Sequence, residues 1–117
     1  MHQYKNLTLW TKSIALVTKT YKLTASFPDT ERFNLISQIN RASVSIPSNI
    51  AEGAGRNSDK EFKQFLAMAH ASSYELETQL IISSNLGFLA PTDLEELLND
   101  INELQKMNYA LQVKLST

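Results

Sequence analysis

Hydrophobic positions recur along most of the chain at intervals of three and four residues, the spacing that places side chains on one face of an α-helix. Four segments follow the pattern: Leu7, Trp10, Ile14, Val17 and Tyr21; Phe33, Ile36, Ile39, Ser43, Ile46 and Ile50; Phe62, Leu66, Ala69, Ser73, Leu76 and Leu80; and Leu94, Leu97, Ile101, Leu104, Asn108, Leu111 and Leu115. This alternation is typical of helices packed about 20° from antiparallel. We expect an all-α protein, with residues 1–117 forming a single up-down-up-down antiparallel four-helix bundle.

Several helix ends are marked by capping residues. Two S/T-x-x-E sequences predict capping boxes at helix starts, namely Ser58 with Glu61 and Thr92 with Glu95. Glycines predict helix ends, with Gly53 as the left-handed residue that ends the second helix and Gly87 closing the third.

Pro47 interrupts the second helical segment, where it lacks an amide donor and disfavours helical backbone at the residue before it. We expect a kink at Pro47. Three interpretations remain open: a bend that wraps the helix around the core, a break in the helix, or a bend that shapes a surface for a partner.

Composition argues against an enzyme. The chain has no Cys and only two His, so thiol chemistry is excluded and little remains to bind a metal. The stretch GAGR at 53–56 lacks the lysine and hydroxyl of a phosphate-binding loop, and no Glu-x-x-His pair is present. We expect no catalytic residue, no metal and no cofactor. Without an apolar leader or a run of ~20 apolar residues, we expect a cytoplasmic protein with no membrane contact.

The charges are separated along the chain, although the net charge is only -1. Lys5, Lys12 and Lys19 recur every seven residues, followed by Lys22, whereas residues 91–105 carry five acidic residues and no basic one. The lysines could pair with the start of the fourth helix, or form a stripe that follows phosphates. Arg56 lies beside the start of the third helix, whose amides either Ser58 or a bound phosphate could satisfy. We expect Trp10 and Tyr109 to be core residues, not stacking platforms.

The second helix has a polar face with little charge, unlike a solvated face rich in Lys and Glu. On the third helix, Phe65, Met68 and Ile82 lie outside the core stripe. Both features indicate an additional buried surface, for which self-association is the obvious explanation.

Several motifs resemble those of the four-helix bundle family encoded by intervening sequences in bacterial 23S ribosomal RNA genes. They are SQINRA at 37–42, SIPSNIAEG at 45–53, KEF at 60–62, ELETQL at 75–80 and LGFL at 86–89. The resemblance implies a ring-shaped assembly, a homopentamer, with no catalytic residue. The chain is also similar to the accessory variability determinant of diversity-generating retroelements, a pentamer that binds nucleic acid and a reverse transcriptase.

Two hypotheses follow. In the first, a homo-oligomer binds ribosomal RNA or another structured nucleic acid through Lys5, Lys12, Lys19, Lys22, Arg41 and Arg56. In the second, an oligomeric scaffold contacts its own subunits or another protein, such as a reverse transcriptase, and binds no nucleic acid. The residues expected at the oligomer interface are Gln38, Arg41, Ser45, Pro47, Asn49, Glu52, Phe65 and Met68.

Overall fold

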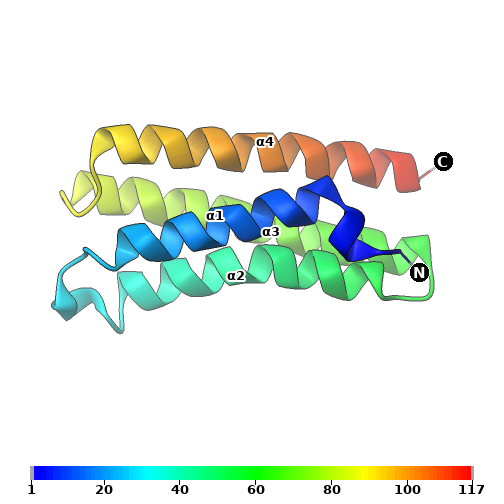
Figure 1. Cartoon of the computed structure of the whole chain (residues 1–117), viewed down its shortest axis with the longest axis horizontal. Coiled ribbons are helices and arrows are strands. Elements are labelled where there is room, and N and C mark those ends of the chain that lie inside the picture. Colours follow the sequence, from blue (N-terminus) through cyan, green and yellow to red (C-terminus); the bar gives the residue numbers. More distant parts are fainter. Residues whose placement is uncertain (1, 117) are drawn as a thin grey trace.

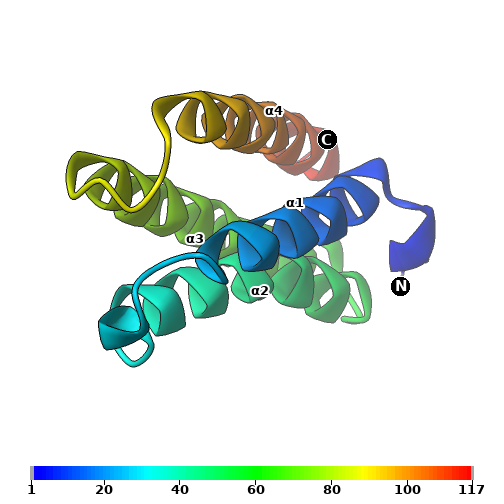
Figure 2. The ribbon, with the colours of Figure 1, turned by 60° about the vertical axis from the view of Figure 1, so that its left-hand side comes forward.

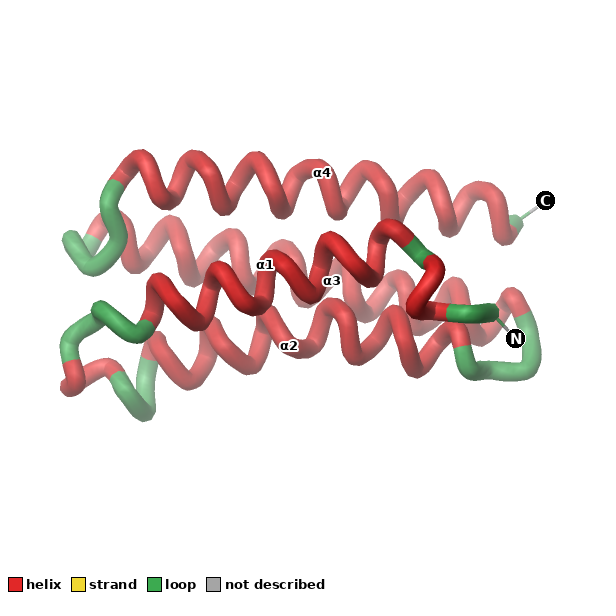
Figure 3. The backbone as a smooth tube through the Cα atoms, in the orientation of Figure 1, coloured by secondary structure: helices red, strands yellow, loops and turns green. Residues whose placement is uncertain are grey.

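The computed structural model describes residues 2–116 and shows a helical protein. The elements in chain order are η1 (Tyr4–Asn6), α1 (Thr8–Thr24), η2 (Asp29–Glu31), α2 (Leu35–Ala54), α3 (Asp59–Asn85) and α4 (Pro91–Leu115). Figure 3 shows helices joined by short loops, and residues 2–116 contain no strand. The predicted all-α class with four main helices is confirmed.

The four helices lie side by side along the long axis of a molecule measuring 45 × 23 × 20 Å, with both chain ends at the same end (Figure 1). Each helix packs against two others: α1 and α3 both contact α2 and α4. The two views in Figures 1 and 2 place α2 and α4 on opposite sides of the molecule. The α2–α3 pair is packed most extensively and the α1–α4 pair least.

The predicted core stripes of α3 and α4 are confirmed. All six α3 positions are buried, from Phe62 to Leu80. On α4 the centre of the stripe is buried at Leu97, Ile101, Leu104 and Asn108, and its ends are half-buried. Asn108 is accommodated because its side-chain amide donates to the Leu66 carbonyl at 3.0 Å.

The predicted core stripe of α1 holds only at Leu7 and Trp10, which are partly buried and pack against the core, and is wrong for the rest. Its buried residues are Leu9, Ser13, Leu16, Thr20 and Thr24, whereas Ile14 and Tyr21 are exposed. The buried hydroxyls avoid a desolvation penalty because they donate to carbonyls within the helix, as Ser13 does to Trp10 and Thr20 does to Leu16, both at 2.7 Å. Ile14 and Tyr21 of the predicted stripe are therefore left outside the core.

The predicted start of the second stripe is also wrong. Phe33 precedes α2 and is 86% exposed. Phe27, in the connection from α1, is buried instead, with its ring centroid 5.9 Å from that of Phe88 after α3. Ile39, Ser43, Ile46 and Ile50 are buried as predicted.

Two predicted helix ends are confirmed. The Ser58 hydroxyl accepts the Glu61 amide at 3.2 Å, which forms the expected cap at the start of α3. Gly87 follows α3 with a φ of 81°, the only positive φ found in residues 2–116. This conformation suits glycine because it has no Cβ.

The other end predictions are wrong. α4 begins at Pro91, not at a Thr92 capping box, because proline suits the first helical position, whose amide would have no partner. α2 continues to Ala54, so Gly53 does not end it in a left-handed conformation. α2 also continues through Pro47 as one helix, which contradicts the helix-break interpretation.

Gly53 allows α2 and α3 to approach each other closely. A Cβ at this position would lie 2.6 Å from the Phe65 Cβ and 3.0 Å from the Phe62 ring. Because the Phe65 Cβ is fixed to the α3 backbone, the clash could be relieved only by moving the two helices apart.

Gly53→Ala is therefore expected to lower the free energy of unfolding by about 1–3 kcal/mol through overpacking, despite the better helix propensity of alanine. Urea denaturation followed by circular dichroism measures the change. Gly55→Ala is the matched control, because a Cβ there would meet its nearest neighbour at an ordinary 3.6 Å. Equal effects at the two glycines would contradict the close-approach explanation.

Candidate functional site

The outward face of α1 forms an apolar groove with α2, which we call the α1–α2 groove. Its cavity of about 320 Å³ is lined by Tyr4, Trp10, Ile14, Val17, Thr18, Val44, Pro47, Ser48 and Ala51. The Tyr4 ring meets the Trp10 ring edge-on, with centroids 5.1 Å apart. Three of the apolar residues expected in the core from α1, namely Trp10, Ile14 and Val17, therefore line a surface groove that has no charged lining residue, although Trp10 also packs against the core.

The lysines of α1 pair with the acidic residues of α4. Lys19 Nζ donates to Glu96 Oε1 and Asp100 Oδ2, each at 2.7 Å, and Lys12 pairs with Glu103. The hydrogen bonds to Asp100 and to Glu96 raise the pKa of Lys19 above its ordinary value. The ion-pairing interpretation is confirmed for Lys12 and Lys19.

The remaining predicted phosphate-binding cations are distributed over several elements. Lys5 lies 5.9 Å from the Tyr4 ring centroid, and Arg56 lies 4.6 Å from the Phe65 ring and 3.9 Å from Glu52. Lys22 and Arg41 are exposed and have no ion pair within residues 2–116.

The residues predicted for the oligomer interface are divided between two surfaces. Pro47 lines the α1–α2 groove, whereas Ser45 contacts α3 and Asn49 is bonded to Ser45 within α2. The Ser45 and Ser72 hydroxyls are 2.8 Å apart, and Asn49 Nδ2 donates to the Ser45 carbonyl at 2.8 Å. The other predicted interface residues comprise exposed Gln38, Arg41, Glu52 and Met68, and half-buried Phe65. Ile82 is exposed on α3, outside the core stripe as expected.

A second groove runs between α3 and α4, which we call the α3–α4 groove. One cavity in it, of about 290 Å³, is lined by His70, Tyr74, Asn102, Gln105, Lys106 and Tyr109. The expectation that Tyr109 is a core residue is wrong, because its side chain is 66% exposed. The His70 ring contacts the Tyr74 ring edge-on at 5.1 Å, and His70 Nδ1 is buried with no hydrogen-bond partner in the described chain.

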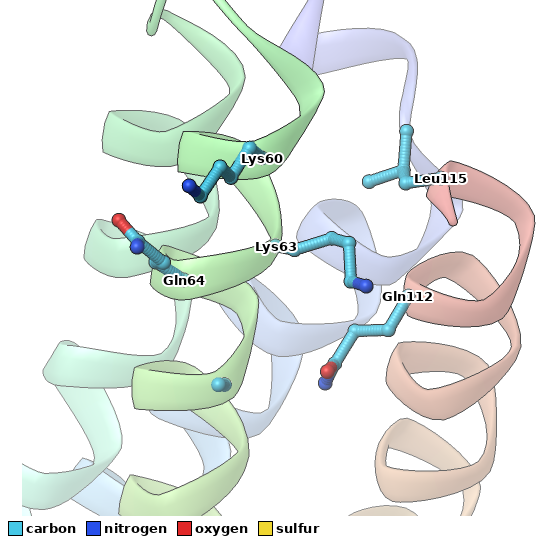
Figure 4. Close-up of a pocket in the computed structure, with 6 residues that line it drawn as sticks. Lys60, Lys63, Gln64, Gln112 and Leu115 are labelled. Carbon is cyan, nitrogen blue, oxygen red and sulfur yellow. The ribbon is translucent and has the colours of Figure 1, made fainter. Parts of the chain in front are cut away.

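A second cavity in the α3–α4 groove lies between the start of α3 and the end of α4. Its volume is about 430 Å³ and its lining residues are Lys60, Lys63, Gln64, Ala67, Gln112 and Leu115. In Figure 4, Lys63 and Gln112 reach toward each other from the two helices, while Lys60 and Gln64 extend to the other side of α3. The Lys63 ammonium hydrogen-bonds the Ser116 hydroxyl and has no ion pair among residues 2–116.

No group of three or more His, Asp or Glu side chains in residues 2–116 is placed to hold a metal ion. Within the same range, no helix is both long and apolar enough to cross a membrane.

The model of a family described as 23S rRNA-intervening sequence protein matches residues 5–110. The chain belongs to this family. It is also similar in structure to a protein of unknown function from the S23 ribosomal protein family of Bacteroides thetaiotaomicron, with a TM-score of 0.81 and 23% identity. That match covers 90% of this chain and 98% of the other, and at this identity it shows the fold alone. No curated protein matches the chain.

The SIPSNIAEG stretch of this 23S rRNA-intervening sequence family member contributes to three different contacts. Ile46 and Ile50 are buried in the core, and Gly53 permits the close approach of α3. The Ser45 hydroxyl contacts Ser72 of α3 and is also bonded by Asn49, while Pro47 lines the α1–α2 groove. The stretch therefore contributes both to the face of α2 that packs against α3 and to the face that lines the α1–α2 groove.

The sequence interpretation missed both grooves of this 23S rRNA-intervening sequence family member. Val44, Pro47 and Ala51 are spaced by three and four residues beside the core stripe of α2, a signal that could have indicated the first groove. Tyr74 and Tyr109 are distant in sequence and carry no shared motif. Only the packing of α3 against α4 brings them to one cavity.

Lys19→Gln is expected to lower the free energy of unfolding by up to about 1 kcal/mol at neutral pH, since exposed ion pairs contribute little individually. Because the folded-state pKa of Lys19 is raised, its contribution is complete below the unfolded-state pKa and is lost as the pH rises through the folded-state value. The difference between wild type and variant should therefore narrow at strongly alkaline pH, and also in about 1 M salt.

Urea denaturation at several pH values measures this difference. Lys22→Gln is the control, because Lys22 has no ion pair in the described chain, and it should change stability little. A difference that persists unchanged through alkaline pH would contradict a role for the Lys19 charge.

Proposed function

We propose that this protein is a non-catalytic, cytoplasmic scaffold that assembles from several copies of itself through the α1–α2 groove. The proposal includes an up-down-up-down antiparallel bundle in each subunit, with α2 bent at Pro47 to shape the subunit contact. The family resemblance favours a ring of five.

The observation that carries this proposal is a second apolar face on α1. Leu9 and Leu16 are buried in the core together with Ser13, Thr20 and Thr24. Trp10, Ile14 and Val17 line the groove beside that buried face. Burying apolar surface stabilises a protein or complex by about 25 cal/mol for each Å² removed from water, so covering this groove would be favourable. Contiguous exposed apolar residues mark interaction surfaces more often than isolated ones do.

A second copy of the chain is the occupant that fits this groove best. The lining residues carry no charge, so the groove has no attraction for a polyanion and is suited to an apolar surface. A patch that contacts a different patch on the next subunit produces a closed ring when the rotation closes.

Ile14→Lys is expected to dissociate the oligomer, since an ammonium group would be desolvated at the subunit contact. Light scattering coupled to size-exclusion chromatography should find the variant near the 13.2 kDa of one chain and the wild type at a multiple of that mass. Ile81→Lys on α3 is the matched control, because Ile14 and Ile81 are both 39% exposed, and it should leave the mass unchanged.

Circular dichroism should show that both variants retain helical structure. A monomeric wild type would overturn the assembly proposal. Equal dissociation by the two variants would instead reject the α1–α2 groove as the contact.

A second candidate function is binding of ribosomal RNA or another nucleic acid by the assembled protein. It is supported by the cations that lack acidic partners in residues 2–116, which include Lys22, Arg41, Lys60 and Lys106. An oligomer would carry one set of these unpaired cations on each subunit. Binding of a protein such as a reverse transcriptase is compatible with either function.

The binding of a structured ribosomal RNA fragment should weaken as salt increases. Three phosphate contacts predict a fall in affinity of roughly 40-fold between about 50 and about 200 mM salt. Fluorescence anisotropy measures this slope. Lys12→Gln should change binding little, because Lys12 already pairs with Glu103. If no RNA binds even at the lower salt concentration, nucleic-acid binding is rejected and only the scaffold function remains.

A further inference from the structure

The two cavities of the α3–α4 groove lie along one continuous strip of side chains. On α3 the lining residues recur every three or four positions, at Lys60, Lys63, Ala67, His70 and Tyr74. On α4 the same spacing links Asn102, Gln105, Tyr109 and Gln112. Seven residues separate Lys63 from His70, so the two cavities are offset by about two helical turns, or roughly 10 Å.

The strip carries positive charge, although the protein as a whole has a net charge of -1. Lys63 and Lys106 line the two cavities, Lys60 borders one of them with its side chain extending to the other side of α3, and none of the described residues that line them is acidic. Three of the acidic residues of α4 are instead occupied by the lysines of α1. The groove is therefore a locally cationic surface that complements a polyanion.

We propose that the α3–α4 groove binds an unpaired, single-stranded segment of RNA, with bases stacked on Tyr74 and Tyr109 and phosphates contacted by the lysines. This inference rests on the second candidate function, nucleic-acid binding, and names the site and the form of RNA that it recognises. The basic residues of α1 and α2 are not needed for it.

The two tyrosines are suited to stacking because their rings are available and Tyr74 is held in place. Tyr74 is 50% exposed and Tyr109 is 66% exposed, and they approach the same cavity from different helices. The His70 ring lies nearly perpendicular to the Tyr74 ring, at 84°, and supports its orientation. Bases stack on such rings whatever their sequence, since every base has an aromatic face.

Polar groups in the tyrosine cavity can contact the edge of a stacked base. Gln105 Nε2 donates to the Ser73 hydroxyl at 3.1 Å, which fixes the amide and leaves its carbonyl oxygen as an acceptor. Asn102 offers a second amide from the next turn of α4. Amides of this kind read the edges of bases that are not paired.

The lysines are placed to contact the backbone of the same strand. Lys106 lines the tyrosine cavity, and Lys63 lines the neighbouring one. A strand that lies along the groove would thus pass from an aromatic cavity to a cationic one. A duplex offers no free base faces to the tyrosines, which is why the groove favours a single strand.

Anisotropy with a fluorescent single-stranded RNA of about twelve nucleotides, at low salt, tests this proposal. Tyr109→Ala is expected to weaken binding by roughly 5- to 150-fold, the loss typical of one stacked base. Tyr109→Phe retains the ring and should bind nearly as wild type does. Tyr21→Ala is the matched control, since Tyr21 on α1 is similarly exposed but lies outside the groove.

A second readout locates the RNA directly. In an aromatic ¹H–¹³C NMR spectrum, the Tyr74 and Tyr109 ring signals should shift on addition of the RNA, while the Tyr21 signals should not. A duplex of the same sequence should produce smaller shifts at the same concentration.

The outcomes distinguish the proposal that RNA binds in the α3–α4 groove from the broader proposal that the protein binds nucleic acid. If the wild type binds the single strand but Tyr109→Ala and Tyr74→Ala bind equally well, the groove proposal is overturned and nucleic-acid binding stands. Equal binding of duplex and single strand would also overturn it. If the wild type binds neither the oligonucleotide nor a structured RNA, both proposals fail.

Discussion

The close packing of α2 against α3 is the constraint on which the rest of the molecule depends. It requires a residue without a Cβ at Gly53, because the Phe65 Cβ occupies that space. The same approach brings the Ser45 and Ser72 hydroxyls within 2.8 Å. α1 then packs against α2, and α4 against α3, so the outer two helices meet each other least. Long lysine side chains and carboxylates bridge that looser α1–α4 contact.

α1 can bury hydroxyl groups because their donors are satisfied. Thr20 donates to the Leu16 carbonyl of its own helix, and Thr24 donates to the Asn40 side chain on α2. Leu9 and Leu16 are the large apolar side chains of this inward face. Trp10, Ile14 and Val17 line the α1–α2 groove beside it, where they give the bundle a surface that differs from an ordinary solvated one.

Pairing across the α1–α4 contact also divides the surface electrostatically. Three of the five acidic residues of α4, Glu96, Asp100 and Glu103, are paired with Lys12 and Lys19. The second half of α4 and the facing part of α3 carry lysines, amides and tyrosines without an acidic residue in the groove. Although the net charge is near zero, the surface of the protein is uneven. It has ion pairs between α1 and α4, an apolar groove between α1 and α2, and a groove with lysines and tyrosines between α3 and α4.

The sequence by itself determined the helical class, the core faces of α3 and α4, the Ser58 cap and the family. These depend on local spacing and backbone chemistry, or on contiguous motifs such as SIPSNIAEG. Only the tertiary structure decided which face of α1 is buried, because a hydroxyl bonded to its own helix can replace an apolar side chain in the core. It likewise decided that Tyr109 is exposed beside Tyr74, since periodicity describes one helix and a groove is formed by two.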